Sequence, residues 1–142
     1  MHRSKAEVYF HLVWATWERQ PLVTSDVERA LYRCIEKEVQ SLKCAVLAIG
    51  GMPDHVHLVV KAPTRVSPAQ LAQRVKGVSS TFARNTLRAG EFFGWQDGYA
   101  VFSICPPHVS TVIAYVESQN RHHADNTIVS DWEETHEEID DG

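Results

Sequence analysis

The sequence predicts a single α+β domain in which short strands alternate with amphipathic helices. Two observations predict this class. Runs rich in β-branched and aromatic residues alternate with longer stretches whose apolar residues recur every three or four positions. The chain has 142 residues, 44% of them hydrophobic, which is enough for one domain with a real core. No repeat or low-complexity linker divides it, so we assign residues 1–130 to the domain and 131–142 to a tail.

The first strand and the first helix are the clearest elements. Residues 7–16 (EVYFHLVWAT) have the composition of a well-buried strand. A capping box formed by Ser25 and Glu28 then opens a helix that ends near Lys43. Its predicted apolar face consists of Val27, Ala30, Leu31, Cys34, Ile35 and Val39.

A hairpin and a second helix follow. Residues 44–51 and 55–62 are apolar runs joined by Met52-Pro53-Asp54, a turn sequence that favours antiparallel pairing. Ser67-Pro68 combines a cap with a first-turn proline and starts a helix that runs until Gly90. Its apolar positions are Leu71, Val75, Val78 and Phe82.

The last strand and helix complete the order βαββαβα. Residues 99–104 alternate as a short strand, and Pro106-Pro107 ends it and opens a helix. The apolar stripe of that helix consists of Val109, Val112, Ile113 and Val116. This order predicts the split βαβ, ferredoxin-like sandwich with an added C-terminal helix. We expect the helices on one sheet face, which leaves the other face for a partner.

Charge and cysteine content limit the class of protein. The net charge is −4, but residues 131–142 hold seven of the eighteen acidic residues and no basic one, so residues 1–130 carry +3. We interpret the tail as a solvated segment, with masking of a nucleic-acid surface as the alternative. Three cysteines at no metal-like spacing indicate free thiols in a reducing compartment, the cytoplasm. No segment indicates targeting or a membrane anchor.

His55 and His57 are the first candidate functional residues. They are two apart in a predicted strand, so both imidazoles leave the same face and one cation can bridge them. Two neutral imidazoles suit Mn, Co or Zn, and also Mg where oxygen ligands are added. On spacing alone, two incidental surface histidines remain the alternative.

The last helix supplies a second group of candidates. Tyr115 lies about 110° from the centre of the apolar stripe, which places it off the core face. Gln119 follows one turn later and presents its carboxamide beside the phenol. A nucleophilic tyrosine and a neutral oxygen ligand complement the two histidines as a phosphoryl-transfer site. A tyrosine at the rim of the core is the alternative.

Two weaker groups suit contact with nucleic acid. Arg74, Lys76, Arg84 and Arg88 on the second helix are candidates for phosphate contact, with ordinary solvated charges as the alternative. Aromatic residues that could stack unpaired bases, although core packing is the favoured interpretation, are Trp14, Trp17, Phe92, Phe93 and Trp95.

With these residues in view, the chain resembles the small HUH single-tyrosine transposases of bacterial insertion sequences and their REP-associated relatives. The resemblance rests on PDHVHLVV (53–60), which holds the His-hydrophobic-His signature, and on YVESQ (115–119), which holds the tyrosine and a third metal ligand. HLVWATWER (11–19), VKGVSS (75–80) and WQDGYAVFSI (95–104) extend it over residues 7–124. The acidic tail departs from the family pattern.

The resemblance implies a metal-dependent DNA strand transferase. It implies Mg or Mn held by His55, His57 and Gln119, with Tyr115 forming a 5′-phosphotyrosine intermediate, and His122 is a candidate helper for its deprotonation. It also implies recognition of single-stranded DNA and DNA hairpins, by a homodimer whose active sites combine histidines of one subunit with the tyrosine helix of the other. Two rival functions remain: a domesticated nuclease acting on REP palindromes, and a non-catalytic nucleic-acid-binding module.

Overall fold

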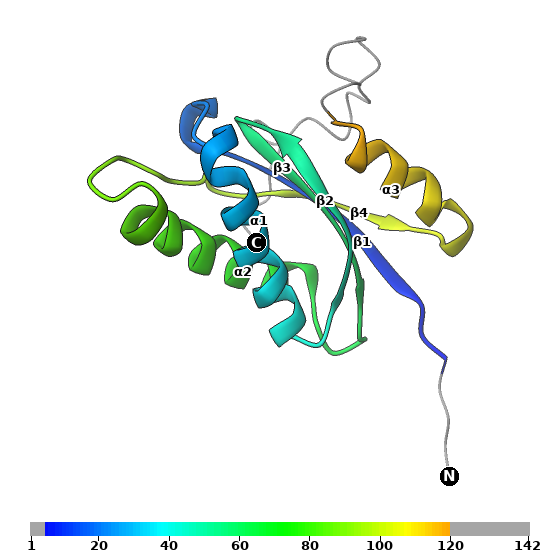
Figure 1. Ribbon diagram of the computed structural model, residues 1–142. Helices are drawn as coiled ribbons and strands as arrows, with labels where there is room; N and C mark the ends of the chain where they lie inside the picture. Colours follow the sequence, from blue (N-terminus) through cyan, green and yellow to red (C-terminus); the bar gives the residue numbers. More distant parts are fainter. Residues whose placement is uncertain (1–4, 120–142) are drawn as a thin grey trace.

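The structure, a computed structural model, describes residues 5–119 and contains one four-stranded antiparallel sheet (Figure 1). The strands are β1 (Val8–Ala15), β2 (Ala45–Met52), β3 (His55–Ala62) and β4 (Ala100–Ile104). Their order in the sheet is β2-β3-β1-β4, so β3 separates β1 from β2. This arrangement confirms the predicted ferredoxin-like α+β fold. The acidic tail and His122 lie outside the described residues.

In the described part of the chain, three α-helices and three short helical turns connect and cover the strands. The helices are α1 (Ser25–Ser41), α2 (Pro68–Phe82) and α3 (Val109–Glu117). The turns are η1 (Trp17–Arg19), η2 (Ala83–Leu87) and η3 (Pro106–His108). Within residues 5–119, no helix combines the length and the apolar character needed to cross a membrane.

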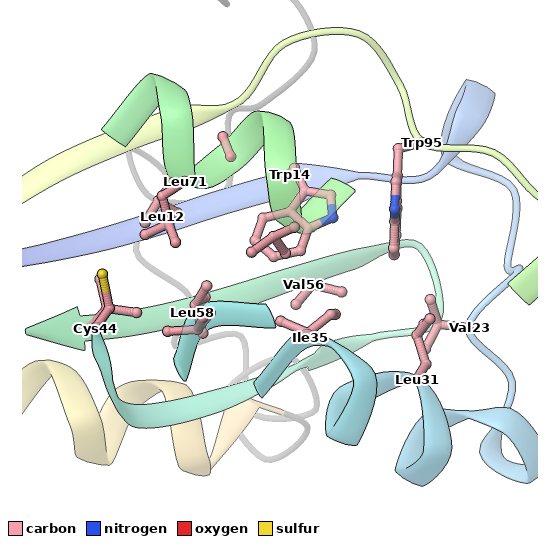
Figure 2. Packing of buried hydrophobic residues seen from close by; sticks show 14 of the residues in the cluster. Leu12, Trp14, Val23, Leu31, Ile35, Cys44, Val56, Leu58, Leu71 and Trp95 are labelled. Carbon is pink, nitrogen blue, oxygen red and sulfur yellow. The ribbon is translucent and has the colours of Figure 1, made fainter. Parts of the chain in front are cut away.

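The large core lies between the sheet and the pair α1 and α2. Leu12 and Trp14 from β1 meet Leu58 from β3 in this layer (Figure 2). On α1, the buried residues Val27, Leu31, Ile35 and Val39 confirm most of the predicted apolar face. The prediction for α2 was wrong at Val78, which is 40% exposed. The buried position belongs to Ser79, whose hydroxyl accepts a hydrogen bond from the Trp95 indole.

The second face of the sheet is covered by α3, so the prediction that all helices share one face was wrong. Figure 1 shows α3, yellow to orange, across the sheet from α1 and α2. A helix with an apolar stripe needs a surface against which to bury it. The stripe of α3 packs there into a second cluster with Ala48, Val59 and Ile104.

Of the two helix caps predicted from the sequence, that of α2 is confirmed and that of α1 is wrong. Ser67 caps α2 as predicted, because its hydroxyl accepts a hydrogen bond from the Gln70 backbone N–H. The predicted capping box of α1 is absent. The N-cap is Thr24, one residue earlier, and its hydroxyl donates to the Asp26 carboxylate instead of capping the backbone.

Candidate active site

The central element of the candidate site is β3, whose alternation sends two imidazoles to the α3 side of the sheet. Val56 and Leu58 enter the large core, whereas His55 and His57 point the other way. Both histidines are buried, at 1% and 0% exposure. Their ring centroids are 5.1 Å apart. The alternative of two incidental surface histidines therefore does not describe this pair.

A third buried histidine, His11 on β1, joins the pair. Its Nε2 lies 2.9 Å from Nδ1 of His57, and the two rings stack with centroids 5.1 Å apart. His11 pairs with Val59 in the sheet, which makes it a diagonal neighbour of His57 on the same face. His11 was not among the site residues predicted from the sequence. The available signal was a polar side chain inside an otherwise apolar strand.

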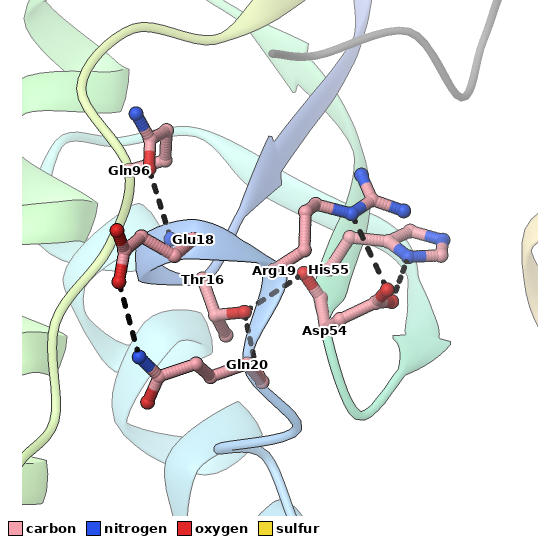
Figure 3. A network of polar contacts seen from close by, with 7 residues as sticks. All are labelled: Thr16, Glu18, Arg19, Gln20, Asp54, His55 and Gln96. Carbon is pink, nitrogen blue, oxygen red and sulfur yellow. Dashed lines mark hydrogen bonds and ion pairs between the residues drawn. The ribbon is translucent and has the colours of Figure 1, made fainter.

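Asp54 holds the other histidine from the β2–β3 turn (Figure 3). One carboxylate oxygen lies 2.7 Å from His55 Nδ1, and the other lies 3.3 Å from Nε of Arg19. Burial alone would raise the pKa of Asp54, but the hydrogen bond from His55 and the charge of Arg19 outweigh it, so the pKa falls below its ordinary value. Asp54 is therefore a carboxylate at neutral pH.

Tyr115 approaches the histidines from α3, and Gln119 follows just beyond the end of that helix. The Tyr115 ring lies edge-on to His57, with centroids 5.9 Å apart. The prediction that Tyr115 lies off the buried face was wrong, because Tyr115 is 6% exposed. The buried residues of α3 are Val112, Tyr115 and Val116, and buried Gln119 follows two residues beyond its end, whereas Val109 and Ile113 lie half-buried at its margin. The sheet beneath α3 carries imidazoles, so a polar residue such as Tyr115 can pack against it. A packing face predicted from the apolar residues of α3 alone was therefore wrong.

The carboxamide of Gln119 is a buried polar group next to the histidines' face of the sheet. The residue is 2% exposed, and within residues 5–119 neither its Oε1 nor its Nε2 has a hydrogen-bond partner. Such a group normally has a partner, because leaving it unsatisfied is costly. The two imidazoles and this amide oxygen are chemically suitable ligands for a divalent cation. In the described part of the chain, no three His, Cys, Asp or Glu side chains form a metal site by themselves.

Close contact between α3 and β2 sets the position of Tyr115. A Cβ atom on Gly50 would lie 2.4 Å from the backbone oxygen of Val116. Only glycine therefore allows α3 to sit this near the sheet. A cavity of about 440 Å³ lies beside this contact and reaches Gln119. Its remaining walls are Glu28, Tyr32, Ile49, Gly50, Gly51, Val116, Glu117 and Ser118.

Comparison with known proteins identifies the family. The family model described as "Transposase IS200 like" matches residues 4–119. The chain belongs to the IS200-like transposase family. The ISDra2 transposase TnpA of Deinococcus radiodurans is 23% identical over 128 residues, covering 84% of this chain and 91% of that protein.

Two solved structures share the fold of this IS200-like transposase. A transposase candidate from Deinococcus radiodurans R1 aligns with a TM-score of 0.64 and 21% identity, covering 89% of this chain and 98% of the other. A REP-associated tyrosine transposase bound to a REP hairpin aligns with a TM-score of 0.63 and 15% identity, covering 93% and 78% of the two chains.

The basic residues predicted to contact phosphates in this transposase lie on the α2 side of the sheet, across from Tyr115. Arg74 pairs with Glu38 on α1, and Lys76 donates to the backbone oxygens of Gln96 and Gly98. Burial lowers the pKa of Lys76, and nearby Asp97 partly opposes this. Arg88 contacts the Leu22 oxygen, the Thr24 hydroxyl and Glu91. Exposed Arg84 contacts only the Phe93 oxygen among the described residues, at 3.5 Å.

The aromatic residues divide between core and surface. Trp14, Phe93 and Trp95 are buried in the large core, as the favoured interpretation predicted. Trp17 and Phe92 are 40% and 55% exposed. They lie near one another, because the Trp17 backbone N–H donates to the Gly94 oxygen, and the Phe92 ring lies 3.1 Å from where a Gly94 Cβ would stand.

Proposed function

We propose that this transposase cleaves and rejoins single-stranded DNA at insertion-sequence ends, with Tyr115 as the nucleophile. The observation that carries the proposal is the position of Tyr115, whose ring lies 5.9 Å from that of His57, in the buried layer that also holds His55 and Gln119. A phenol beside two imidazoles and an amide is a compact set of groups for phosphoryl transfer. Membership of a transposase family supports the same reaction class.

The proposed reaction is an exchange of one phosphodiester for another. The Tyr115 oxygen attacks the scissile phosphorus in line, the bond from phosphorus to the 3′ oxygen breaks, and a free 3′-hydroxyl leaves. The 5′ phosphate stays bound to the tyrosine. A second strand's 3′-hydroxyl then reverses the attack and reseals DNA without a nucleotide cofactor. Because the reference pKa of a phenol is about 10, loss of its proton must accompany the attack.

His55, His57 and Gln119 fit a divalent cation, Mg or Mn, as the resident metal. The fit rests on two buried imidazoles on one face and on the buried Gln119 carboxamide, which has no hydrogen-bond partner in residues 5–119. Such a cation supplies Lewis-acid polarisation of a phosphate oxygen and stabilises the charge that develops there. The chain's own contribution is to hold these side chains on rigid elements and to exclude water around Tyr115.

The proposed substrate is an unpaired strand next to a DNA hairpin. A structural neighbour is a REP-associated transposase bound to a REP hairpin, which supports hairpin recognition here. Exposed Trp17 and Phe92 are suited to stacking on unpaired bases, and Arg84 is the best placed of the four basic candidates. Arg84 contacts the segment that holds Gly94, next to Trp17 and the η1 turn that also carries Arg19. Arg74, Lys76 and Arg88 are second candidates for phosphate contact.

We further propose a cytoplasmic homodimer. Strand β4 pairs only with β1 in the described sheet, and its Val101 is 38% exposed, so this edge offers a second copy an unpaired strand. The resemblance implied that the tyrosine helix comes from the partner subunit. In this chain, by contrast, α3 packs on its own sheet and Tyr115 lies against its own His57. We therefore assign the described state to an arrangement in cis.

A covalent-adduct assay tests the proposed function. Wild-type protein with Mn²⁺ and a labelled single-stranded hairpin substrate should form an adduct that survives denaturation, and Tyr115→Phe should form none while still binding the DNA. Tyr99→Phe is the matched control, because Tyr99 is half-buried and packs against the large core, on the other face of the sheet from Tyr115. Cleavage by Tyr115→Phe would exclude this mechanism.

The same assay separates the two rival functions. Hairpin binding by the wild-type protein with no adduct under any metal would favour a non-catalytic binding module. An adduct formed on isolated REP palindromes, but not on insertion-sequence ends, would favour a domesticated REP nuclease.

A further inference from the structure

Both histidines proposed as metal ligands are held at the same ring atom by different residues. Nδ1 of His57 lies 2.9 Å from Nε2 of His11, and Nδ1 of His55 lies 2.7 Å from the Asp54 carboxylate. The two partners come from separate elements, β1 and the β2–β3 turn. In both rings the Nδ1 atom is therefore engaged with the protein, and Nε2 is the atom that can face a ligand.

We propose that His11 and Asp54 are positioning residues that fix both histidines in the Nδ1–H tautomer and so make Nε2 the metal-binding atom of each. This inference rests on the proposed function, because that function supplies the cation. A neutral imidazole that donates one N–H keeps a lone pair on its other nitrogen, and metal-binding histidines usually donate that second N–H to a carboxylate, a carbonyl oxygen or water. Asp54 matches this pattern, and His11 replaces the usual oxygen with a nitrogen acceptor.

The Asp54 side of this arrangement is anchored by several independent contacts. The Asp54 backbone oxygen accepts hydrogen bonds from the Thr16 N–H at 2.9 Å and the Thr16 hydroxyl at 3.1 Å. The Arg19 guanidinium holds the carboxylate from the other side. Arg19 and Glu18 have φ angles of 57° and 52°, a left-handed conformation that is costly for residues other than glycine. Such a conformation persists only where surrounding contacts enforce it, and the Gln96 side chain accepts the Glu18 N–H here (Figure 3).

The His11 side is fixed by packing. His11 is 1% exposed, and its ring lies between His57 and Phe102, whose centroids are 5.1 and 5.9 Å away. Because β1 is a central strand, its pairing with β3 and β4 fixes the backbone that carries this ring. Which of the two rings carries the shared proton decides whether His57 can bind a cation. If His57 donates from Nδ1 to His11, its Nε2 can bind a cation; if His11 donates to His57, that Nε2 carries a proton and cannot.

Nitrogen-15 NMR of the metal-free wild-type protein tests the tautomer directly. We expect the His55 and His57 resonances to show protonated Nδ1 and unprotonated Nε2. A protonated Nε2 on His57 would overturn the assignment of His11. This measurement needs neither a bound cation nor DNA, so it decides the inference even if the wild-type protein proves to bind no Mn²⁺, a result that would refute the proposed metal site instead.

Mn²⁺ titration of variants, followed by electron paramagnetic resonance, tests the positioning role. His11→Phe keeps an aromatic ring but removes the acceptor, and Asp54→Ala removes the carboxylate. We expect each to weaken Mn²⁺ binding by about 10–100-fold. His11→Gln and Asp54→Asn keep an oxygen acceptor and should recover most of the affinity.

His108→Phe, at an exposed position on η3, is the matched control and should bind Mn²⁺ as the wild type does. If His11→Phe or Asp54→Ala unfolds, the Gln and Asn variants still decide. Equal affinity in the folded His11→Phe and wild-type proteins, or affinities of His11→Gln and Asp54→Asn as low as those of a His57→Ala protein, would overturn the proposal.

Discussion

The two faces of the sheet differ in what they bury. The face under α1 and α2 contains only apolar side chains from β1 and β3, such as Leu12, Trp14 and Leu58. The face under α3 buries three histidines and a glutamine beside Val59 and Tyr115. The imidazoles, the phenol and the carboxamide on the second face are groups that can bind cations or move protons.

The difference shows how one strand can serve stability and function together. Alternate residues of β3 point to opposite faces, so HVHLVV places its imidazoles on one side and Val56, Leu58 and Val60 on the other. The apolar side anchors the strand in the large core. Because β3 is a central strand, it holds the two histidines more rigidly than a loop would.

Neighbouring substitutions on β3 should separate these two roles, and they give the largest expected effects. Leu58→Ala removes a fully buried side chain from the large core and should lower the free energy of unfolding by about 2–5 kcal/mol. His57→Ala should lower the rate of strand cleavage by about 10²–10³-fold, the scale expected for losing a charge-stabilising group. Urea unfolding and single-turnover cleavage measure the two quantities.

The division of stability and catalysis between the two faces would be wrong if Leu58→Ala lowered only the cleavage rate and His57→Ala lowered only the stability. Full cleavage activity in folded His57→Ala would remove the histidine face from the reaction. A Leu58→Ala protein with wild-type stability would show that the α1 and α2 face does not hold the strand in place.

The contact between α3 and β2 offers a second way to disturb only one face. Gly50→Ala would place a Cβ 2.4 Å from the Val116 oxygen, so α3 must move away from the sheet. A displacement of about 1 Å at a reacting group can reduce the rate by about 10²-fold, and we expect a loss of that size in adduct formation.

Gly77→Ala is the matched control on the other face. No atom lies within 4 Å of the new Cβ on α2, so this change should stabilise the protein by about 0.5–1 kcal/mol without altering cleavage. Equal cleavage rates in the two variants would show that the close approach of α3 does not position Tyr115.

Most of the fold could be predicted from the sequence because local signals were strong there. Ser67 followed by proline marks the start of α2, and β3 is an apolar run apart from its two histidines and Lys61. The exceptions have a common physical cause. Ser25 was predicted as the cap of α1 instead of Thr24, and Val78 as a buried position of α2 instead of Ser79. Tertiary contacts, from Arg88 to the Thr24 hydroxyl and from the Trp95 indole to Ser79, decide between these neighbouring positions.

The candidate site was predicted in outline but not in its supporting contacts. The spacing of His55 and His57 and the single turn between Tyr115 and Gln119 are visible in the sequence. His11 is not, because its contact with His57 spans 46 residues and depends on the register of β1 against β3. The burial of Tyr115 was not predicted either. The buried face of α3 was inferred from its apolar residues, but the sheet face beneath it carries histidines, against which a tyrosine can pack.

The smallest expected effect concerns the two exposed arginines associated with α2. Arg84 contacts the Phe93 oxygen near Trp17 and the η1 turn, whereas Arg74 pairs with Glu38 on α1. We place the DNA path along the η1 end of the sheet toward Tyr115. On that path, Arg84→Ala should lower hairpin affinity only a few-fold. It should also reduce the slope of log affinity against log salt by about 0.7, the value for one phosphate contact on a single strand. Arg74→Ala should leave the slope unchanged. Fluorescence anisotropy at several salt concentrations measures both, and a larger change for Arg74 would place the DNA along α1 and α2, across the sheet from Tyr115.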